Sequence, residues 1–335
     1  MRILIATGIY PPDIGGPAQY AKNLALEFRK MGHQVKVLSF SKVKKFPTGV
    51  RHLLYFFWIL FSLKGVDFVL ALDTFSVAFP VALAKKIFPK KTLMRIGGDF
   101  LWESFIERTG KKVLLRNFYE TELKNLSLKE RIIFSITKWN LKVFDVLIFT
   151  TKWQFEIWKE PYKIDYKKVK FVENYFGPKK VFSGFSSKNF LSASRESKIK
   201  NLDALEMAFE KAREENQEII LTFKKNLSYE KLLEKIKNSY ALILVSLSEV
   251  SPNFILDGIR FGKPFILTKE TGFYDKLKDV GIFVDPLNVQ EIKEKILFLA
   301  KEENYKIYQK KIAEFNFVHT FEDIAKEIIE IVEKI

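Results

Sequence analysis

The chain has 335 residues, of which 47% are hydrophobic and 29% charged, and this length suggests two globular domains. Cysteine is absent, which excludes disulfides and thiolate metal sites. The three histidines, His33, His52 and His319, are widely spaced, so no metal site is expected. The first residues lack the basic segment and long apolar core of a signal peptide, so a cytoplasmic protein is expected.

The net charge of +16 is concentrated in the first half of the chain. Residues up to Lys180 include 32 basic and 15 acidic side chains, whereas the remainder includes 24 and 25. Such a positive field attracts nucleic acid, anionic lipid or phosphorylated substrates, although a solvated lysine-rich surface would give the same counts. Because no DNA- or RNA-binding motif accompanies the charge, we expect no nucleic-acid partner.

Short apolar runs alternate with helical stretches along the first half of the chain. The runs predict buried strands at Arg2–Ala6, Gln34–Ser39, Phe68–Ala71, Thr92–Arg95 and Val146–Thr150. The stretches between them predict helices at Pro17–Met31, Val50–Leu63, Phe75–Phe88 and most of Lys111–Phe144. Buried strands separated by helices indicate βαβ units and a parallel sheet.

The pattern pauses at Asn174–Asn189, which we interpret as a linker because it is rich in Gly, Pro, Ser and Lys, and then it restarts. The second half predicts strands at Phe190–Ser192, Ile219–Phe223, Ala241–Val245, Phe265–Thr268 and Ile282–Val284. It predicts helices at Asn201–Glu214, Tyr229–Asn238, Pro252–Phe261, Asn288–Ala300 and Phe321–Ile335. Two successive doubly wound domains place ligands at the carboxyl ends of their strands, in the cleft between the domains.

Three loops that follow predicted strands carry the candidate site residues. After the first strand, Gly15 and Gly16 precede a helix, where the backbone can approach an anion closely. Arg195 and Lys200 lie in the loop after the strand at 190–192, from which both could reach phosphate oxygens. Each loop has an ordinary structural alternative, namely a plain turn or a solvated basic loop.

The third loop begins after the strand at 241–245 and leads into a helix. It contains Glu249, and Ser251 is expected to cap a helix that has Pro252 at its first position. Asp257 lies about two turns further along. The two acids could accept hydrogen bonds from sugar and ribose hydroxyls, while the N–H groups at the helix start would meet a diphosphate. An exposed loop Glu and an exposed helical Asp are the structural alternative.

The ordered set of motifs resembles family 4 glycosyltransferases of the GT-B fold, also called glycosyl transferases group 1. The set comprises the Gly15-Gly16 loop, Gly32-His33 before a strand, Arg195-x4-Lys200, Glu249-x7-Asp257, Phe261–Thr268, Thr271–Asp275 and Gly281–Pro286. The resemblance implies two Rossmann-like, doubly wound α/β domains that face a cleft. It implies an acceptor-side domain at residues 1–175, a nucleotide-sugar-binding domain at 176–318, and a last helix, 319–335, packing back on the first.

The resemblance also implies an activity, which is transfer of a sugar from a nucleotide-diphosphate sugar, such as a UDP- or GDP-sugar, to a glycan or lipid-linked acceptor. Retention of configuration, no metal and no cofactor are expected. Arg195 and Lys200 would offset the diphosphate charge, Glu249 would contact the donor sugar, and Asp257 would hold the ribose. The remaining donor-binding positions implied by the motifs are Gly15, Gly16, Ser251, Asn253 and Phe254.

Several positions depart from the family pattern. Asp257 replaces the second Glu, Val250 replaces a frequent Gly, and the chain between Ile219 and Leu244 is short by roughly one βα unit. A non-catalytic module that binds a nucleotide sugar or a glycan is therefore the alternative function. Where many members have His after the fourth strand, Asp99 stands here, and it is a candidate acceptor-side base or, equally, a helix N-cap.

One apolar segment bears on the acceptor. Leu53–Leu63 is almost wholly apolar, lies among basic residues and is too short to span a bilayer. Packing on the first sheet is one interpretation of this segment. The other is contact with an anionic membrane surface that holds a lipid-linked acceptor, which would make the protein peripheral on the inner membrane face and suit polysaccharide biosynthesis.

Overall fold

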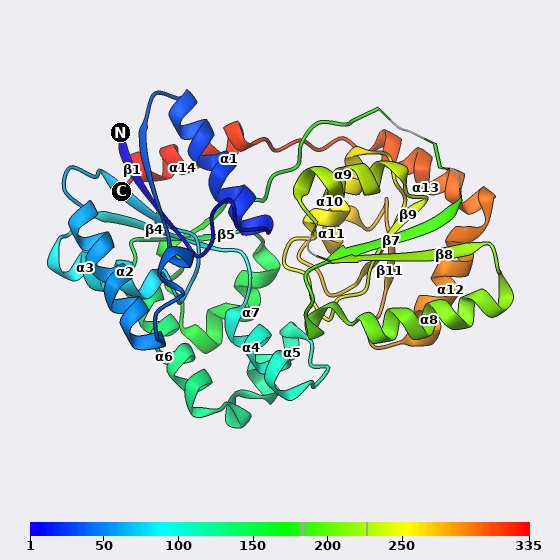
Figure 1. The fold of residues 1–335 in the computed structure, drawn as a ribbon, viewed down its shortest axis with the longest axis horizontal. Coiled ribbons are helices and arrows are strands. Elements are labelled where there is room, and N and C mark those ends of the chain that lie inside the picture. The colour runs from blue at the N-terminus through cyan, green and yellow to red at the C-terminus, as the bar shows by residue number, and fades with distance from the viewer. Residues whose placement is uncertain (182–183, 186, 226) are drawn as a thin grey trace. The chain divides into compact units, whose positions relative to one another are not determined.

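The chain folds as two compact units in the computed structural model, which describes residues 1–181, 184–185, 187–225 and 227–335 (Figure 1). The first unit comprises Met1–Ser104, Glu122–Asn174 and His319–Ile335. The second comprises Phe105–Thr121 and Tyr175–Val318. A segment from the first half of the chain thus belongs to the second unit. Phe182, Ser183 and Ser186 of the expected linker lie outside the described residues.

The first unit is built on a six-stranded parallel sheet in the order β2-β1-β3-β4-β5-β6. Its strands are β1 (Arg2–Thr7), β2 (Gln34–Ser39), β3 (Phe68–Ala71), β4 (Lys91–Ile96), β5 (Val146–Phe149) and β6 (Val169–Phe171). Every residue of β3 and β5 is buried, as expected for apolar runs covered on both faces. Because all the strands are parallel, the loops that follow them share the carboxyl edge of this sheet.

Helices surround the first sheet. They are α1 (Gly16–Lys30), α2 (Thr48–Ser62), α3 (Ala78–Ile87), the start of α4 (Phe100–Thr109), α6 (Leu128–Val143), α7 (Lys152–Tyr162) and α14 (Phe321–Glu333), with short 3-10 turns at Phe40–Val43, Leu123–Asn125 and Tyr166–Lys168. α6 begins where it does because Ser127 and Glu130 form a capping box. α14 packs against α1, with the rings of Tyr20 and Phe321 5.8 Å apart.

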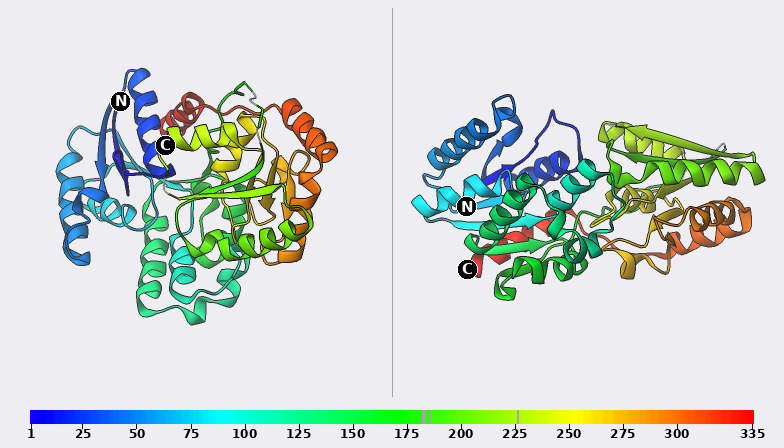
Figure 2. Two further views of the ribbon diagram at one scale, coloured as in Figure 1. Left: turned by 45° about the vertical axis from the view of Figure 1, so that its right-hand side comes forward. Right: turned by 90° about the horizontal axis from the view of Figure 1, so that it is seen from below.

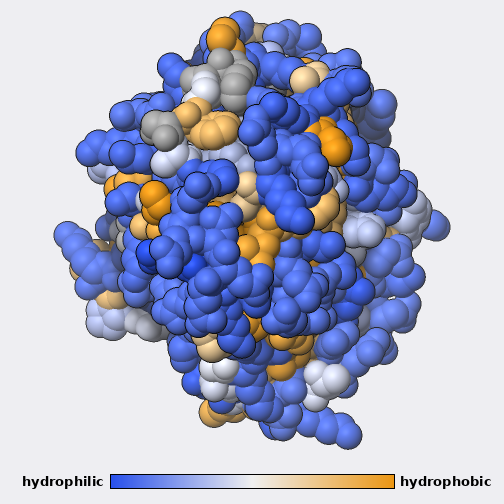
Figure 3. Space-filling model, turned by 90° about the vertical axis from the view of Figure 1, so that its right-hand side faces the viewer, coloured by the Kyte–Doolittle hydropathy of each residue, from blue (hydrophilic) through white to orange (hydrophobic). Residues whose placement is uncertain are grey.

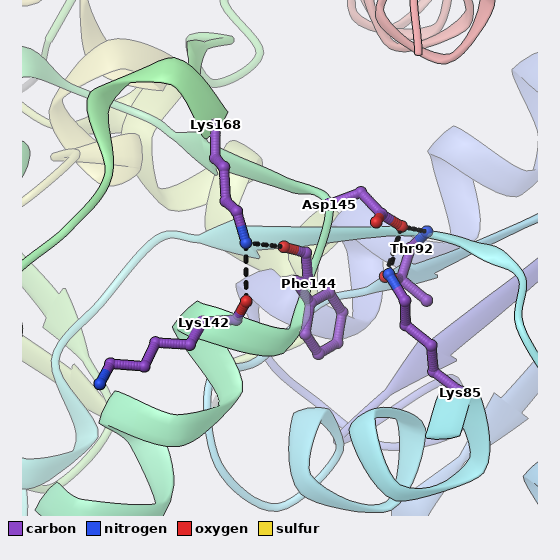
Figure 4. A network of polar contacts seen from close by, with 6 residues as sticks. All are labelled: Lys85, Thr92, Lys142, Phe144, Asp145 and Lys168. Atoms are coloured by element: carbon purple, nitrogen blue, oxygen red, sulfur yellow. Dashed lines mark hydrogen bonds and ion pairs between the residues drawn. The ribbon is translucent and has the colours of Figure 1, made fainter. Parts of the chain in front are cut away.

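Polar contacts join elements at the amino edge of the first sheet (Figure 4). Asp145, just before β5, accepts hydrogen bonds from Thr92 N at 2.8 Å and from Lys85 Nζ at 2.5 Å. Burial raises the pKa of Asp145, but the bonds from Lys85 and Thr92 outweigh burial and lower it overall. Lys168 Nζ donates to the carbonyls of Lys142 and Phe144 and so satisfies the end of α6. The amino edge lies at the opposite end of the strands from the carboxyl edge, and these contacts stabilise the fold.

The second unit is built on a five-stranded parallel sheet in the order β11-β10-β9-β7-β8. Its strands are β7 (Lys188–Ser194), β8 (Ile219–Lys225), β9 (Ala241–Leu244), β10 (Phe265–Thr268) and β11 (Ile282–Val284). Its helices are the end of α4, α5 (Leu115–Thr121), α8 (Leu202–Glu215), α9 (Tyr229–Asn238), α10 (Asn253–Arg260), α11 (Tyr274–Leu277), α12 (Val289–Ala300) and α13 (Glu302–Glu314), with a 3-10 turn at Lys198–Lys200. β7 begins at Lys188, so the last two residues of the expected linker, Lys188 and Asn189, are strand.

Helices cover both faces of the second sheet (Figure 2). In β9, Ala241 and Ile243 join the core beneath α8 and α12, whereas Leu242 and Leu244 join the core beneath α9 and α10. This alternation is the period-two pattern of a strand buried on both sides. Between β8 and β9 the described chain forms a single helix, α9. β8 stands last in the strand order and is therefore an edge strand.

Candidate functional site

The candidate site of the second unit lies at the carboxyl edge of its sheet, where Lys200 and Glu249 form an ion pair. Lys200 Nζ lies 2.5 Å from Glu249 Oε1, and the two side chains are 15% and 11% exposed. The backbone of Glu249 is fixed on both sides, because its N–H donates to Glu270 O at 2.7 Å and its carbonyl accepts from Gly272 N at 3.0 Å. The loop after β10 therefore holds the backbone of Glu249, which itself lies in the loop after β9.

The loop after β7 presents the basic candidates. Lys200 ends a 3-10 turn, and Asn201 after it adopts a left-handed conformation with φ 54°. Asn201 Nδ2 donates to the carbonyls of Val245 and Pro286, which anchors the turn to the loops after β9 and β11. Arg195 lies in the same loop with an exposed side chain. The structure thus places an anchored lysine and an exposed arginine on one loop of this edge.

The start of α10 differs from the sequence prediction. α10 begins at Asn253, and Pro252 occupies the N-cap position without any side-chain cap. Ser251 therefore does not cap the helix, and its buried Oγ has no hydrogen-bond partner among the described residues. Asn253 is exposed and Phe254 is buried in the core of the unit. Of the three, Asn253 presents a polar side chain to solvent, and the Ser251 hydroxyl keeps an unused hydrogen-bonding capacity.

Asp257 lies on α10 within a buried polar network. Its Oδ1 accepts from Arg260 Nη1 at 2.7 Å and from Tyr229 Oη at 3.0 Å, while no hydrogen bond from a described residue reaches Oδ2. Burial raises the pKa of Asp257, and Arg260 and Tyr229 oppose that rise. Arg260 also donates to Pro178 O and accepts from Lys180 N, so the network reaches the chain before β7.

The sequence predicted neither Tyr229 nor Arg260 as part of the site. Tyr229 opens α9 behind the Ser228 cap, and nothing in its local pattern points to α10. Arg260 lies three residues after Asp257, which is the spacing of neighbouring side chains on a helix surface, so that signal was present in the sequence.

The segment Phe105–Thr121 also holds this edge of the second sheet together. Glu107 accepts from Ser197 Oγ and, at 2.8 Å, from Lys198 N in the loop after β7. The N–H of Leu115 donates to Ser248 Oγ at 3.0 Å in the loop after β9.

A second pair of contacts extends that support. Arg116 Nε donates to Glu270 Oε2 at 2.6 Å, and Lys112 pairs with Asp203 at 2.6 Å. Burial raises the pKa of Glu270, which Arg116 opposes. One segment therefore supports the loops after β7, β9 and β10. No local motif predicted this, because each of these contacts spans at least 90 residues of sequence.

In the first unit, Gly15 and Gly16 form the start of α1. Gly15 has φ 145°, a conformation that side chains rarely adopt, and its carbonyl accepts from Ala18 N and Gln19 N. A Cβ on Gly15 would lie 3.3 Å from Ile9 Cδ1. The loop therefore needs glycine at position 15 for backbone conformation, and it brings helix N–H groups to the carboxyl edge of the first sheet.

Asp99 has the geometry of the N-cap alternative. Its Oδ1 accepts from Trp102 N at 2.9 Å at the start of α4, and its Oδ2 accepts from Trp158 Nε1 at 2.8 Å. The side chain is 2% exposed. Both carboxylate oxygens are therefore used in holding α4 and α7.

Another acid at the carboxyl edge of the first sheet was missed by the sequence reasoning. Asp73 follows β3, and its Oδ1 accepts from Phe75 N and Val77 N. Its Oδ2 lies beside Gly8, where an added Cβ would be 3.3 Å away. Burial raises the pKa of Asp73. The signal available in the sequence was an acid two residues after the end of a buried strand.

Metal-ligand clusters are absent from the part of the chain that the structure describes, where no group of three or more His, Asp or Glu side chains could hold a metal ion.

Comparison with known proteins relates this fold to glycosyltransferases. No protein-family model matches the sequence, and no curated protein matches it. Among solved structures, a glycosyltransferase from Rickettsia africae is 15% identical, with 99% of this chain and 98% of that chain covered and a TM-score of 0.65. Sucrose-phosphate synthase from Thermosynechococcus elongatus is 11% identical, with 100% and 99% covered and a TM-score of 0.75.

A third solved structure is HepE of Anabaena in complex with UDP-glucose, which is 12% identical, with both chains fully covered and a TM-score of 0.66. At such identities the similarity shows the fold. The predicted class, two α/β units with doubly wound parallel sheets, is confirmed. The chain therefore has the fold of the GT-B glycosyltransferases.

Proposed function

We propose that this protein is a glycosyltransferase that moves a sugar from a nucleotide-diphosphate sugar to an acceptor. The observation that carries the proposal is the Lys200–Glu249 pair, which joins a cation and an acid at the carboxyl edge of the second sheet. Parallel α/β sheets bind their ligands at that edge. The likeness to HepE, solved with UDP-glucose, supports a UDP-sugar as donor, and a GDP-sugar is the second candidate.

In this proposal, each group of the second unit has one role. Lys200 and Arg195 offset the diphosphate charge, which grows as the nucleotide leaves. Glu249 accepts a hydrogen bond from a hydroxyl of the transferred sugar. Asp257 accepts from the ribose through Oδ2, while Arg260 and Tyr229 hold Oδ1. Asn253 and the unpartnered Ser251 hydroxyl lie beside the donor at the start of α10.

The first unit would supply the acceptor side. The N–H groups of α1 behind Gly15 and Gly16 would bind an anionic group of a ligand at the carboxyl edge of the first sheet. We propose transfer with retention of configuration, in which the departing phosphate takes the proton of the acceptor hydroxyl. Such a reaction requires no metal, no cofactor and no base from Asp99, whose oxygens already bind Trp102 and Trp158.

We further propose that the acceptor is a glycan or a lipid-linked molecule and that the protein works in the cytoplasm, peripheral on the inner membrane face. The charge distribution supports this proposal, since residues 1–180 hold 32 basic and 15 acidic side chains. A positive surface is attracted to anionic lipid.

A second candidate function is a non-catalytic module that binds a nucleotide sugar or a glycan. The short stretch between β8 and β9, whose described residues form one helix, α9, favours it, because fewer elements remain there to shape a base pocket. Such a module would bind nucleotide without turnover.

Thermal unfolding with a panel of UDP- and GDP-sugars and their nucleoside diphosphates, in excess chelator, tests the donor assignment. A ligand that binds the folded state at one hundred times its Kd adds about 2.7 kcal/mol of stability, so the melting temperature rises by a few degrees. Lys200→Met should lose that rise. If no nucleoside diphosphate raises the melting temperature of the wild type at millimolar concentration, the donor site is wrongly assigned.

A further inference from the structure

Helix α2 (Thr48–Ser62) has two opposite apolar faces. Its inner face packs on the first sheet, where Tyr55 and Ile59 are fully buried and Tyr55 Oη donates to Leu38 O at 2.8 Å. Its outer face carries large side chains that remain exposed to between 39% and 79%. These are Val50, Leu53, Leu54, Phe57 and Phe61.

The exposed side chains form one continuous stripe. Positions 50, 54, 57 and 61 follow the spacing of residues on a single helix face. The rings of Phe57 and Phe61 stack with centroids 6.2 Å apart, and Phe61 is 79% exposed. A surface helix normally turns polar residues outward, so a contiguous apolar stripe marks an interaction surface.

The charge of the residues around this stripe indicates the kind of partner that it binds. The 39 residues from 28 to 66 contain no Asp or Glu and eight basic residues: Arg29, Lys30, Lys36, Lys42, Lys44, Lys45, Arg51 and Lys64. Lys42 lies over the Trp58 ring at 5.7 Å, and Lys45 lies over Phe46 at 5.3 Å. Cations therefore accompany the apolar stripe at both ends of α2.

We infer that the outer face of α2, together with Lys42, Lys44, Lys45 and Lys64, is a docking surface for an anionic lipid bilayer. The helix lies in the plane of the interface, with its stripe among the acyl chains and its lysines against the headgroups. At about 1.5 Å per residue, its 15 residues span about 22 Å, shorter than the hydrocarbon core. In the described chain no helix is long and apolar enough to cross a membrane.

A second copy of the chain fits this surface less well. In a two-fold contact through α2, the stretch 28–66 of one copy would face the same stretch of the other. Each stretch has eight basic residues and no acidic one, so the two copies would repel each other. The face of the protein that Figure 3 shows differs from the outer face of α2, because hydrophilic residues cover most of it and hydrophobic residues form small patches.

This inference deepens the proposed function by naming the membrane partner of a lipid-linked acceptor. The experiment contains no nucleotide sugar, so its outcome does not depend on donor binding. Failure to bind vesicles would leave the donor assignment intact, and failure to bind nucleotides would leave the docking surface intact.

Vesicle co-sedimentation with the full chain tests the surface. The vesicles are phosphatidylcholine alone, or phosphatidylcholine with about a quarter phosphatidylglycerol. The wild type should bind the anionic vesicles at low salt and release as salt rises. Lys44→Glu/Lys45→Glu should weaken binding at least about 25-fold, since each nearby cation contributes roughly a factor of five on an anionic surface. Phe57→Ser/Phe61→Ser should weaken it at least about tenfold.

The matched control is Met207→Ser/Ile220→Thr, which removes two exposed apolar side chains from a part of the second unit that contains Glu206 and Glu210. It should bind vesicles as the wild type does. Circular dichroism checks that each variant is folded, and the lysine variant alters only exposed side chains. Wild-type binding by both α2 variants, or no binding by the wild type at low salt, overturns the inference. A wild-type dimer that Phe57→Ser/Phe61→Ser dissociates would assign the stripe to a second copy instead.

Discussion

Replacing Glu249 by Gln keeps the size of the side chain and removes its negative charge. The carboxylate lies 2.5 Å from Lys200 Nζ, and its backbone N–H and carbonyl are held by Glu270 and Gly272. The amide should therefore occupy the same place. A hydrogen bond to a charged group contributes about 1.5 to 3 kcal/mol, and each 1.36 kcal/mol is a factor of ten in rate, so kcat/KM should fall about 10- to 150-fold.

The same substitution should affect nucleotide binding in the opposite sense. Glu249→Gln releases Lys200 from its ion pair, so the affinity for UDP or GDP should stay the same or rise. Lys200→Met is the contrasting variant and should weaken that affinity by a similar 10- to 150-fold, roughly the loss of one charge-assisted hydrogen bond. Calorimetric titration measures the affinities and nucleotide release measures turnover. Wild-type turnover in Glu249→Gln, or equal loss of nucleotide affinity in both variants, would refute the assigned roles.

Three further substitutions test the structural roles of named residues. Asp99→Ala should lower the free energy of unfolding by about 1 to 3 kcal/mol, because Trp102 N and Trp158 Nε1 lose their hydrogen-bond acceptor. The same variant should leave kcat unchanged. A large loss of kcat in folded protein would instead support Asp99 as a catalytic base. Gly15→Ala should cost about 1 to 3 kcal/mol in urea unfolding because of its φ of 145°, and an unchanged stability would contradict that backbone conformation. Asp145→Ala should cost about 1 kcal/mol at neutral pH, since the side chain is 40% exposed and solvent weakens its pair with Lys85. The pKa of Asp145 is lowered in the folded state, so its contribution to stability is complete above the ordinary aspartate pKa of 3.8 and is lost as the pH falls through the lower folded-state pKa. A difference in stability between wild type and variant that persists in strong acid would contradict this contribution.

Much of the fold could be predicted because its strands are short apolar runs. Phe68–Ala71 was predicted to the residue, since all four side chains are buried and aspartate flanks the run on one side. The helix α13 (Glu302–Glu314) was not predicted, because only Tyr305 and Ile312 are buried on it and its apolar period is weak. The boundary between α5 and α6 was missed as well, because it depends on the Ser127–Glu130 capping box rather than on apolar spacing.

The residues of the candidate site that belong to ordered motifs could be predicted from the sequence. The residues whose positions depend on tertiary packing could not. Lys200 and Glu249 were both expected from their loops, and the structure joins them. Ser251 was expected to cap α10, but Pro252 takes the N-cap position, which a pattern of residue types does not reveal. The contacts of Glu107 and Arg116 with the loops of the second sheet depend on tertiary structure across more than 80 residues. No local pattern encodes such contacts.

Release of nucleoside diphosphate from a panel of UDP- and GDP-sugars, measured in excess chelator, tests the central claim most directly. Sugar transfer, including slow transfer to water when no acceptor is present, must break the bond between sugar and diphosphate. We predict that the wild type releases UDP or GDP from one donor without divalent metal, and that Glu249→Gln and Lys200→Met each reduce this release at least about tenfold. Binding of a nucleotide sugar without release, with every donor and acceptor tried, would contradict the claim and support the non-catalytic module.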